Sequence, residues 1–299
     1  MNRPIAVFGA HGQLGREIVA LARESGVAVA GLARGDADIA DALAVRRALA
    51  ELRPRLVVNA AAYTDVDRAQ TELEAAEAGN VTGPGVLAQE AAALGLPMVH
   101  FSTDFVFDGT RSGPYAETDA IAPTGVYGRS KAAGEARVRA ASGRHIILRT
   151  SWVYGQFGAN FLKTILHLAQ ERDELRVVAD QRGGPTATLD LAEAVLAVDR
   201  TISANPEGEH WGTFHFAASG IASRHSFASE IVAAAHPFTG RRPKVVAIAS
   251  GDYPVLVRRP ANSALDSTRF IRKFGYAPAR WQQRVGEVVR QIYRPGGQE

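Results

Sequence analysis

The sequence predicts an α/β protein with a doubly wound, Rossmann-type parallel sheet and a smaller C-terminal lobe interwoven with it. Short apolar segments rich in β-branched residues alternate with longer, alanine-rich segments of helical pattern. A glycine-rich loop directly follows the first apolar segment. The chain has 299 residues, which is enough for one large α/β domain or two smaller ones.

Six strands are expected because their segments are apolar throughout, as in parallel sheets covered on both faces. These segments are residues 5–10, 27–33, 56–61, 98–103, 145–150 and 213–218. Helical patterns occupy residues 13–24, 41–52, 83–94, 128–141 and 188–203. The alternation loosens after about residue 150. We therefore expect a dinucleotide-binding Rossmann domain of residues 1–151 plus about 185–218, and a second lobe of about 152–184 plus 219–299.

Composition narrows the class of protein. Hydrophobic residues make up 46% of the chain, charged residues 22%, and the formal net charge is only +3, as in a soluble globular protein. The sequence contains no block of like charges, so nucleic-acid binding has little support. The chain has no cysteine, which excludes disulfides and thiolate metal sites. A strand is predicted almost at the first residue, and no apolar run reaches the ~18–20 residues of a membrane span. A cytoplasmic location is expected.

The segment "GAHGQLG" joins the first predicted strand to the first helix and contains Gly9, Gly12 and Gly15. Glycines allow a sharp turn and a close approach of a pyrophosphate, which the N-terminus of the helix attracts. A merely structural turn is the alternative. His11, Gln13 and Leu14 belong to the same predicted cofactor contact.

The second predicted strand is followed by Arg34, where an acidic residue would normally take the ribose 2′-hydroxyl. A guanidinium suits a 2′-phosphate, so NADPH is favoured over NADH, although the nearby Asp36 weakens this preference. Asp38 and Ile39 are expected to flank the adenine. Asp38 as a simple helix cap is the alternative.

Two further motifs carry polar groups toward the same edge of the sheet. Ser102, Thr103 and Asp104 follow the fourth predicted strand, and open α/β sheets place ligands just outside such strand ends. Tyr127 and Lys131 lie four residues apart, hence on one helix face. This Y-x-x-x-K pattern alone is more often an ordinary helix face. The glycine loop, "STD" and the Tyr/Lys pair in this order are together specific.

These motifs resemble the extended short-chain dehydrogenase/reductase superfamily and, more narrowly, the dTDP-4-dehydrorhamnose reductase family. The resemblance runs along essentially the whole chain and rests on "GAHGQLG", "VVNAAAYTDVD", "STDFVFDG", "YGRSK", "LRTSWVYG", "NFLKT", "DQRGGPT" and "RRPANSALD". It implies NADPH-dependent reduction of the C4 ketone of dTDP-4-dehydro-6-deoxy-L-mannose to dTDP-L-rhamnose. The expected partner is a nucleotide sugar, and a homodimer is compatible with the family.

The family implies that Tyr127 protonates the ketone oxygen, that Thr103 donates to the same oxygen, and that Lys131 hydrogen-bonds the nicotinamide ribose. We expect the charge of Lys131 to lower the pKa of Tyr127. Ser102 is expected beside the cofactor. Ala61, Ala62 and Tyr63 are expected to pass along it, with simple core packing as the alternative for the alanines.

The resemblance assigns the substrate to Thr103 and Asp104 and to side chains of the second lobe. Trp152 would form an aromatic wall against the sugar, although a lone tryptophan is more often part of a core. The nucleotide-diphosphate end would contact the segment 181–186 and the residues Asn160, Arg259 and Asn262. Arginine suits phosphate oxygens. An ordinary solvated pair formed by Arg258 and Arg259 is the alternative.

No metal ligand is assigned. Some family members form a magnesium-bridged dimer in which a glutamate matching Glu17 takes part, but a single helical glutamate is usually just solvated. The eight histidines have no ligand spacing. Three alternative functions remain: reduction of another nucleotide-linked 4-keto sugar, a redox-neutral epimerase or dehydratase, and a non-catalytic regulatory subunit. The retention of Thr103, Tyr127 and Lys131 together disfavours the regulatory subunit.

Overall fold

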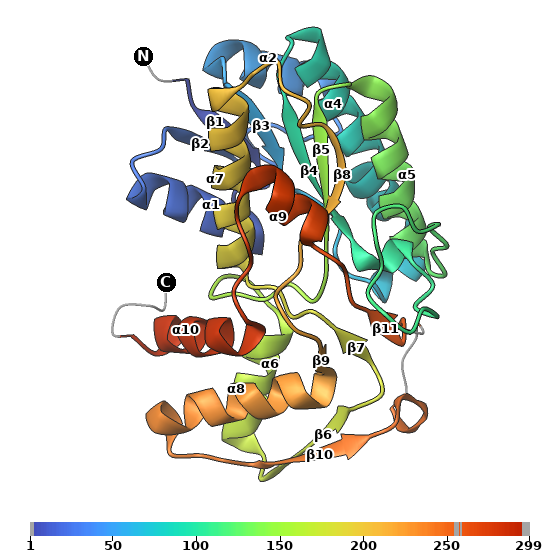
Figure 1. The fold of residues 1–299 in the computed structure, drawn as a ribbon, viewed down its shortest axis with the longest axis vertical. Helices are drawn as coiled ribbons and strands as arrows, with labels where there is room; N and C mark the ends of the chain where they lie inside the picture. The colour runs from blue at the N-terminus through green and yellow to red at the C-terminus, as the bar shows by residue number, and fades with distance from the viewer. Residues whose placement is uncertain (1–2, 254–256, 258, 295–299) are drawn as a thin grey trace.

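The structure is a computed structural model that describes residues 3–253, 257 and 259–294. A six-stranded, fully parallel sheet forms the centre of the larger lobe, in the order β2-β1-β3-β4-β5-β8 (Figure 1). Its strands are β1 (Ile5–Phe8), β2 (Val29–Leu32), β3 (Leu56–Asn59), β4 (Met98–Thr103), β5 (His145–Thr150) and β8 (Gly212–His215). The order reverses between β1 and β3, and ligands bind at such a point in doubly wound sheets.

Helices cover both faces of this sheet because successive residues of its strands are apolar on both sides. Ile5 and Val7 of β1 pack in one core, and Ala6 and Phe8 in another. The first core lies under α1 (Gln13–Glu24), α7 (Thr188–Ala204) and α9 (Thr268–Phe274). The second lies under α2 (Ala42–Leu52), α4 (Gly83–Ala93) and α5 (Val126–Ala141). Figure 1 shows α1 and α7 on the opposite side of the sheet from α4 and α5.

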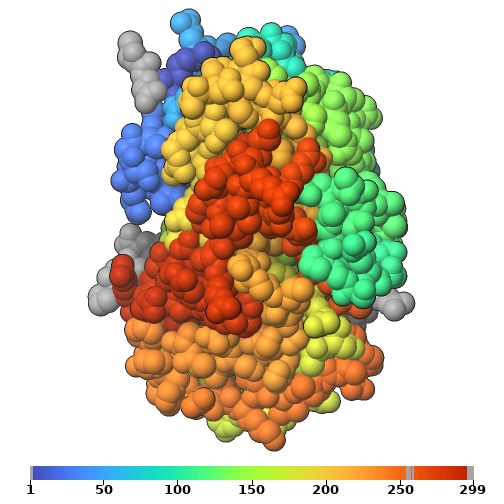
Figure 2. Space-filling view, in the orientation of Figure 1, coloured from blue at the N-terminus to red at the C-terminus, as the bar shows by residue number. Residues whose placement is uncertain are grey.

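A third apolar core holds the lower lobe together, around Tyr154, Phe227 and Trp281. Its helices are α6 (Phe161–Glu171), α8 (Arg224–Thr239) and α10 (Trp281–Tyr293). Its small sheets pair β6 (Glu174–Val178) with β10 (Lys244–Ile248), and β7 (Arg182–Gly183) with β9 (Ala222–Ser223) and β11 (Asn262–Ser263). In Figure 2, α9 and α10 cover the front between the sheet and this lobe.

Short helices and helical turns complete the fold. They are η1 (Arg68–Gln70), α3 (Leu73–Glu77), the π-helical turn η2 (Ala78–Thr82), η3 (Asp104–Val106) and η4 (Ser250–Asp252). No helix among the described residues combines the length and the apolar character needed to cross a membrane.

The predicted fold class and all six predicted strands are confirmed. Four strands are shorter at their carboxyl ends than the apolar segments suggest, since residues such as Gly9 and Ala61 have already entered the loops above the sheet. Gly9 has φ +80°, a conformation that ends β1 and favours glycine. Helix α5 begins at Val126, two residues earlier than predicted, so Tyr127 lies in its first turn.

A buried ion pair fastens α5 to the sheet. Glu135 is fully buried and accepts hydrogen bonds from Arg149 of β5 at 2.7 and 2.8 Å. Ser102 of β4 donates to the same carboxylate at 2.6 Å, and Arg139 donates at 3.1 Å. Burial by itself would raise the pKa of Glu135, but Arg149 and the other donors hold it below its usual value. Glu135 is therefore a carboxylate whose charge is compensated inside the protein.

Replacement of Arg149 by methionine tests this arrangement. Arg149→Met leaves Glu135 buried without its main partner, so we expect the free energy of unfolding to fall by about 3–5 kcal/mol. Urea denaturation at equilibrium measures the loss. Lys244→Met is the control, because Lys244 and Glu174 form an exposed pair 4.0 Å apart that should contribute little. A loss no larger than that of the control would contradict the importance of the buried pair.

Candidate functional site

The glycine loop between β1 and α1 forms a cradle that only small residues permit. A Cβ atom on Gly9 would lie 2.6 Å from the Ala61 nitrogen, and one on Gly15 would lie 2.2 Å from the Gly9 oxygen. Gly12 is the N-cap of α1 and has no side chain to bond the first-turn N–H groups. These groups and the positive end of the helix dipole fit a diphosphate. Gln13 and Leu14 begin α1, and His11 is exposed on the loop.

The carboxyl end of β2 carries an exposed cation. Arg34 donates to Asp38 at 2.9 Å while 87% of its side-chain surface remains exposed. Asp38 also accepts from the Ala40 nitrogen, and Asp36 accepts from the Ala33 nitrogen, so both acids are held by the local backbone. An exposed ion pair of this kind contributes little. The Arg34 guanidinium can therefore turn toward a phosphate without a large cost.

The loops that follow β2 and β3 contain Ile39 and the segment of Ala61, Ala62 and Tyr63. Ile39 is buried, and its side chain fills the space beside Gly83. Asn80, in η2, accepts from the Tyr63 nitrogen and donates to the Tyr63 oxygen, both at 3.0 Å. It also donates to Ser130 of α5 at 3.1 Å. Sequence reasoning missed this buried connector.

Tyr127 and Thr103 meet at the carboxyl end of β4. The Thr103 hydroxyl lies close enough to the Tyr127 phenol to affect its pKa, and the Phe105 ring packs edge-on against the Tyr127 ring, 5.5 Å between centroids. Lys131 lies one turn further along α5 and is only 2% exposed. Its Nζ donates to the Phe101 carbonyl of β4 at 2.6 Å. The structure thus brings together the three residues that the sequence singled out for chemistry.

The pKa values differ from the sequence-based expectation. Burial raises the pKa of Tyr127 to about 12, and the charge of Asp104 raises it further. Burial also lowers the pKa of Lys131 to about 8, against the attraction of Glu135. The pKa of Tyr127 is thus raised in this structure, and not lowered as the sequence suggested, because the effect of burial dominates.

Asp104 and Trp152 follow the carboxyl ends of β4 and β5. Asp104 is 3% exposed and accepts from Thr103 at 2.9 Å. Trp152 adopts φ +47°, a strained conformation for this residue type, and its ring packs against Gly183. The guanidinium of Arg224 lies 3.7 Å from the centre of that ring. Sequence reasoning missed Arg224, a partly buried cation that no motif marks.

Arg259 lies near the same region, above the Phe105 ring at 5.9 Å, and pairs with Asp67 at 2.6 Å. The neighbouring Arg258 lies outside the described residues. The proposed alternative of a solvated arginine pair does not describe Arg259, since its side chain is only 23% exposed.

Three predicted binding residues use their polar atoms within the protein. The Ser102 hydroxyl is bound to Glu135. Asn160 caps α6 and donates to Gln13 at 2.7 Å, which ties the glycine loop to the lower lobe. Asn262 donates to two backbone oxygens at 2.8 Å. In this structure these side chains position other parts of the site.

Glu17 is buried, contrary to the expectation of a solvated residue. It accepts from Thr188 at 2.7 Å and from Gln156 at 3.1 Å, because α1 packs against α7 and Gln156 reaches it from the loop between β5 and α6. Among the residues that the structure describes, no group of three histidine or acidic side chains is arranged to hold a metal.

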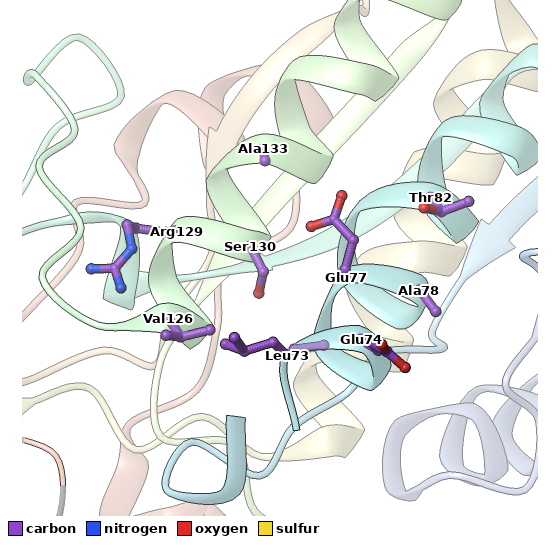
Figure 3. Close-up of a pocket in the computed structure, with 10 residues that line it drawn as sticks. Leu73, Glu74, Glu77, Ala78, Thr82, Val126, Arg129, Ser130 and Ala133 are labelled. Atoms are coloured by element: carbon purple, nitrogen blue, oxygen red, sulfur yellow. The ribbon is translucent and has the colours of Figure 1, made fainter. Parts of the chain in front are cut away.

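A groove of about 670 Å³ lies between α3, η2 and the first turns of α5. Figure 3 shows Leu73 and Glu77 across from Ser130. None of the residues predicted for the site lines this groove. The chemistry suggested by the motifs is therefore gathered above the strands and not here.

Comparisons with known proteins find relatives along nearly the whole chain. Residues 2–294 match the family model described as RmlD substrate binding domain. The chain is 41% identical to dTDP-4-dehydrorhamnose reductase of Sinorhizobium fredii, with 95% of this chain and 96% of that protein covered. It is 42% identical to the enzyme of the same name from Aggregatibacter actinomycetemcomitans, with 95% and 97% covered. A crystal structure of dTDP-4-dehydrorhamnose reductase from Bacillus anthracis in complex with NADP matches with a TM-score of 0.87 at 30% identity, covering 96% and 99%.

Proposed function

The chain belongs to this family of dTDP-4-dehydrorhamnose reductases, as its motifs predicted, and we propose that it reduces the C4 ketone of dTDP-4-dehydro-6-deoxy-L-mannose to dTDP-L-rhamnose. The observation that carries the proposal is the hydroxyl pair of Thr103 and Tyr127, held above β4 at the same edge of the sheet as the glycine cradle. A proton donor thus lies where a dinucleotide can present its nicotinamide.

NADPH, when bound, supplies the hydride for the ketone carbon. Gly9, Gly12 and the first turn of α1 hold the diphosphate, and Arg34 turns toward the 2′-phosphate. NADH lacks that phosphate and binds less tightly. Lys131 reaches the nicotinamide ribose from α5, and the small side chains of Ala61 and Ala62 allow the cofactor to lie close to the chain.

Tyr127 donates the proton that the reduced oxygen needs. Because burial raises its pKa to about 12, the phenol stays protonated at neutral pH. The alkoxide that forms on the substrate is a stronger base than the phenolate, so the transfer is favourable. Thr103 lies beside the phenol and orients the ketone oxygen. Together these groups perform general acid catalysis.

The nucleotide sugar is assigned to the crevice between the sheet and a lobe of residues 152–184 and 219–299. Trp152 and Asp104 face the sugar, and Arg259 faces the diphosphate because a guanidinium matches phosphate oxygens. Asn160 and Asn262 support this surface through the backbone segments that they bind.

We further propose a cytoplasmic location, in keeping with the absence of cysteine, and a homodimer that light scattering would detect.

Turnover with defined substrates tests the function. The protein is mixed with NADPH and dTDP-4-keto-6-deoxy sugars of each stereochemistry, and the products are identified. We expect loss of NADPH absorbance with dTDP-4-dehydro-6-deoxy-L-mannose, and formation of dTDP-L-rhamnose. Preference for another sugar would assign a different reductase, and product without net NADPH loss would indicate an epimerase or dehydratase. No turnover with any substrate would favour a regulatory subunit.

Tyr127→Phe tests the proton donor. Removal of the hydroxyl leaves the ring and its packing, so we expect kcat to fall by about 10²–10⁴-fold while the Kd for NADPH is nearly unchanged. Steady-state kinetics and fluorescence titration measure the two effects. Tyr253→Phe is the matched control, because Tyr253 is 52% exposed. A variant that keeps most of its rate would refute the assignment.

Arg34→Ala tests cofactor preference. Loss of the guanidinium should weaken NADPH binding by roughly tenfold or more, the usual worth of a charge-assisted hydrogen bond, and leave NADH binding unchanged. Titration calorimetry with both cofactors measures the difference. Equal effects on both cofactors, or a wild type that strongly prefers NADH, would contradict the role of Arg34.

A further inference from the structure

The single proton of the Thr103 hydroxyl is already engaged. Thr103 Oγ1 lies 2.9 Å from Asp104 Oδ1 and donates to it, since an ionised carboxylate only accepts. The same oxygen accepts from the Phe105 nitrogen at 3.2 Å. A hydroxyl has one proton and two lone pairs, so the remaining lone pair faces Tyr127. While Asp104 is ionised, Thr103 therefore has no proton to offer to the ketone or to a phenolate.

Asp104 is placed so that it can change this. It is 3% exposed, and its Oδ2 has no hydrogen-bond partner. The groups that face it are the Tyr127 phenol from α5, the Ser263 hydroxyl from β11 and the Arg224 guanidinium from α8. Burial raises the pKa of Asp104 to about 6, against the opposing effects of Ser263, Thr103 and Arg224. The carboxyl group therefore changes its charge close to neutral pH.

We propose that Asp104 is a positioning residue whose protonation reverses its hydrogen bond with Thr103 and thereby directs the Thr103 proton toward the reacting oxygens. This inference rests on the proposed reduction and deepens it, since sequence reasoning assigned Asp104 to sugar binding alone. The protonated carboxyl donates to Thr103 Oγ1. The Thr103 proton then turns toward Tyr127.

The proton balance of the reduction is unchanged by this device. The hydride forms the new C–H bond, Tyr127 gives its proton to the carbonyl oxygen, and Tyr127 becomes a phenolate. Thr103 stabilises that phenolate with a hydrogen bond and keeps its proton, and Asp104 keeps its own. Asp104 thus acts on the rate through orientation, without transferring a proton to the substrate.

Asp104→Asn tests the proposal, because its amide donates to Thr103 at every pH and so mimics the protonated acid. For the wild type, kcat should rise several-fold as the pH falls from about 7.5 to about 5, as a group titrating in this range requires. For Asp104→Asn, kcat should be flat over this range and should match the low-pH value of the wild type. Ser263→Ala removes a hydroxyl that favours the charged carboxylate, so its rise should begin at higher pH.

The alternatives give different results. The proposal would be overturned if kcat of the wild type did not depend on pH over this range. It would also be overturned if Asp104→Asn kept the rise in kcat, or if the variant were folded but slow at every pH. A pure sugar-binding role for Asp104 would raise KM in the variant and leave the pH dependence of kcat in place.

Thermal unfolding supplies a readout that needs no substrate. The folded-state pKa of Asp104 lies above its ordinary value of 3.8, so the folded wild type binds the extra proton at acidic pH and loses stability as the pH rises toward about 6. The Asn variant lacks this loss. Its Tm relative to the wild type should therefore increase from about pH 4.5 to about pH 7. A constant difference would refute titration of Asp104. A wild type without turnover but with this shift would contradict the proposed function alone.

Discussion

The arrangement of the site depends on the buried carboxylate of Glu135. Glu135, Lys131 and Tyr127 are spaced four residues apart on one face of α5. Arg149 and Ser102 bind Glu135 from β5 and β4, and Lys131 binds the Phe101 carbonyl of β4. The helix is thus fastened to two neighbouring strands along its length. A buried ion pair contributes little net stability, but its directional hydrogen bonds define one position of the helix.

Close approach of backbones completes this fastening. A Cβ atom on Gly128 would lie 2.2 Å from the Phe105 oxygen, and one on Gly134 would lie 2.0 Å from the Asn80 oxygen. Two glycines of α5 therefore let the helix touch η3, which begins at Asp104, and η2, whose Asn80 binds the Tyr63 backbone. The cost is a lower helix propensity, which packing of α5 against the sheet offsets.

Burial shifts the pKa values of the ionisable groups around Tyr127. It moves the pKa of Tyr127 and Asp104 upward and that of Lys131 downward, in each case toward the neutral form. Burial also lowers the pKa of Arg224 to about 10 beside Arg259. Charges in such a region interact strongly with a bound anion because little water screens them. The same burial that weakens Lys131 as a cation keeps Tyr127 protonated.

The sequence by itself determined the fold class, the six strands, the family and the residues that meet above β4, since these depend on local patterns and on the rule that parallel strands end at one edge. The roles of the individual site residues stay predictions. Only the tertiary structure decided which polar atoms remain available. Asn160, Asn262 and Ser102 are used by backbone and side-chain partners, Glu17 is buried by α7, and Lys131 donates to the Phe101 carbonyl. It alone revealed Asn80, Arg224 and the engaged proton of Thr103. Hydrogen bonds and burial join residues far apart in the chain, and no spacing along the sequence records them.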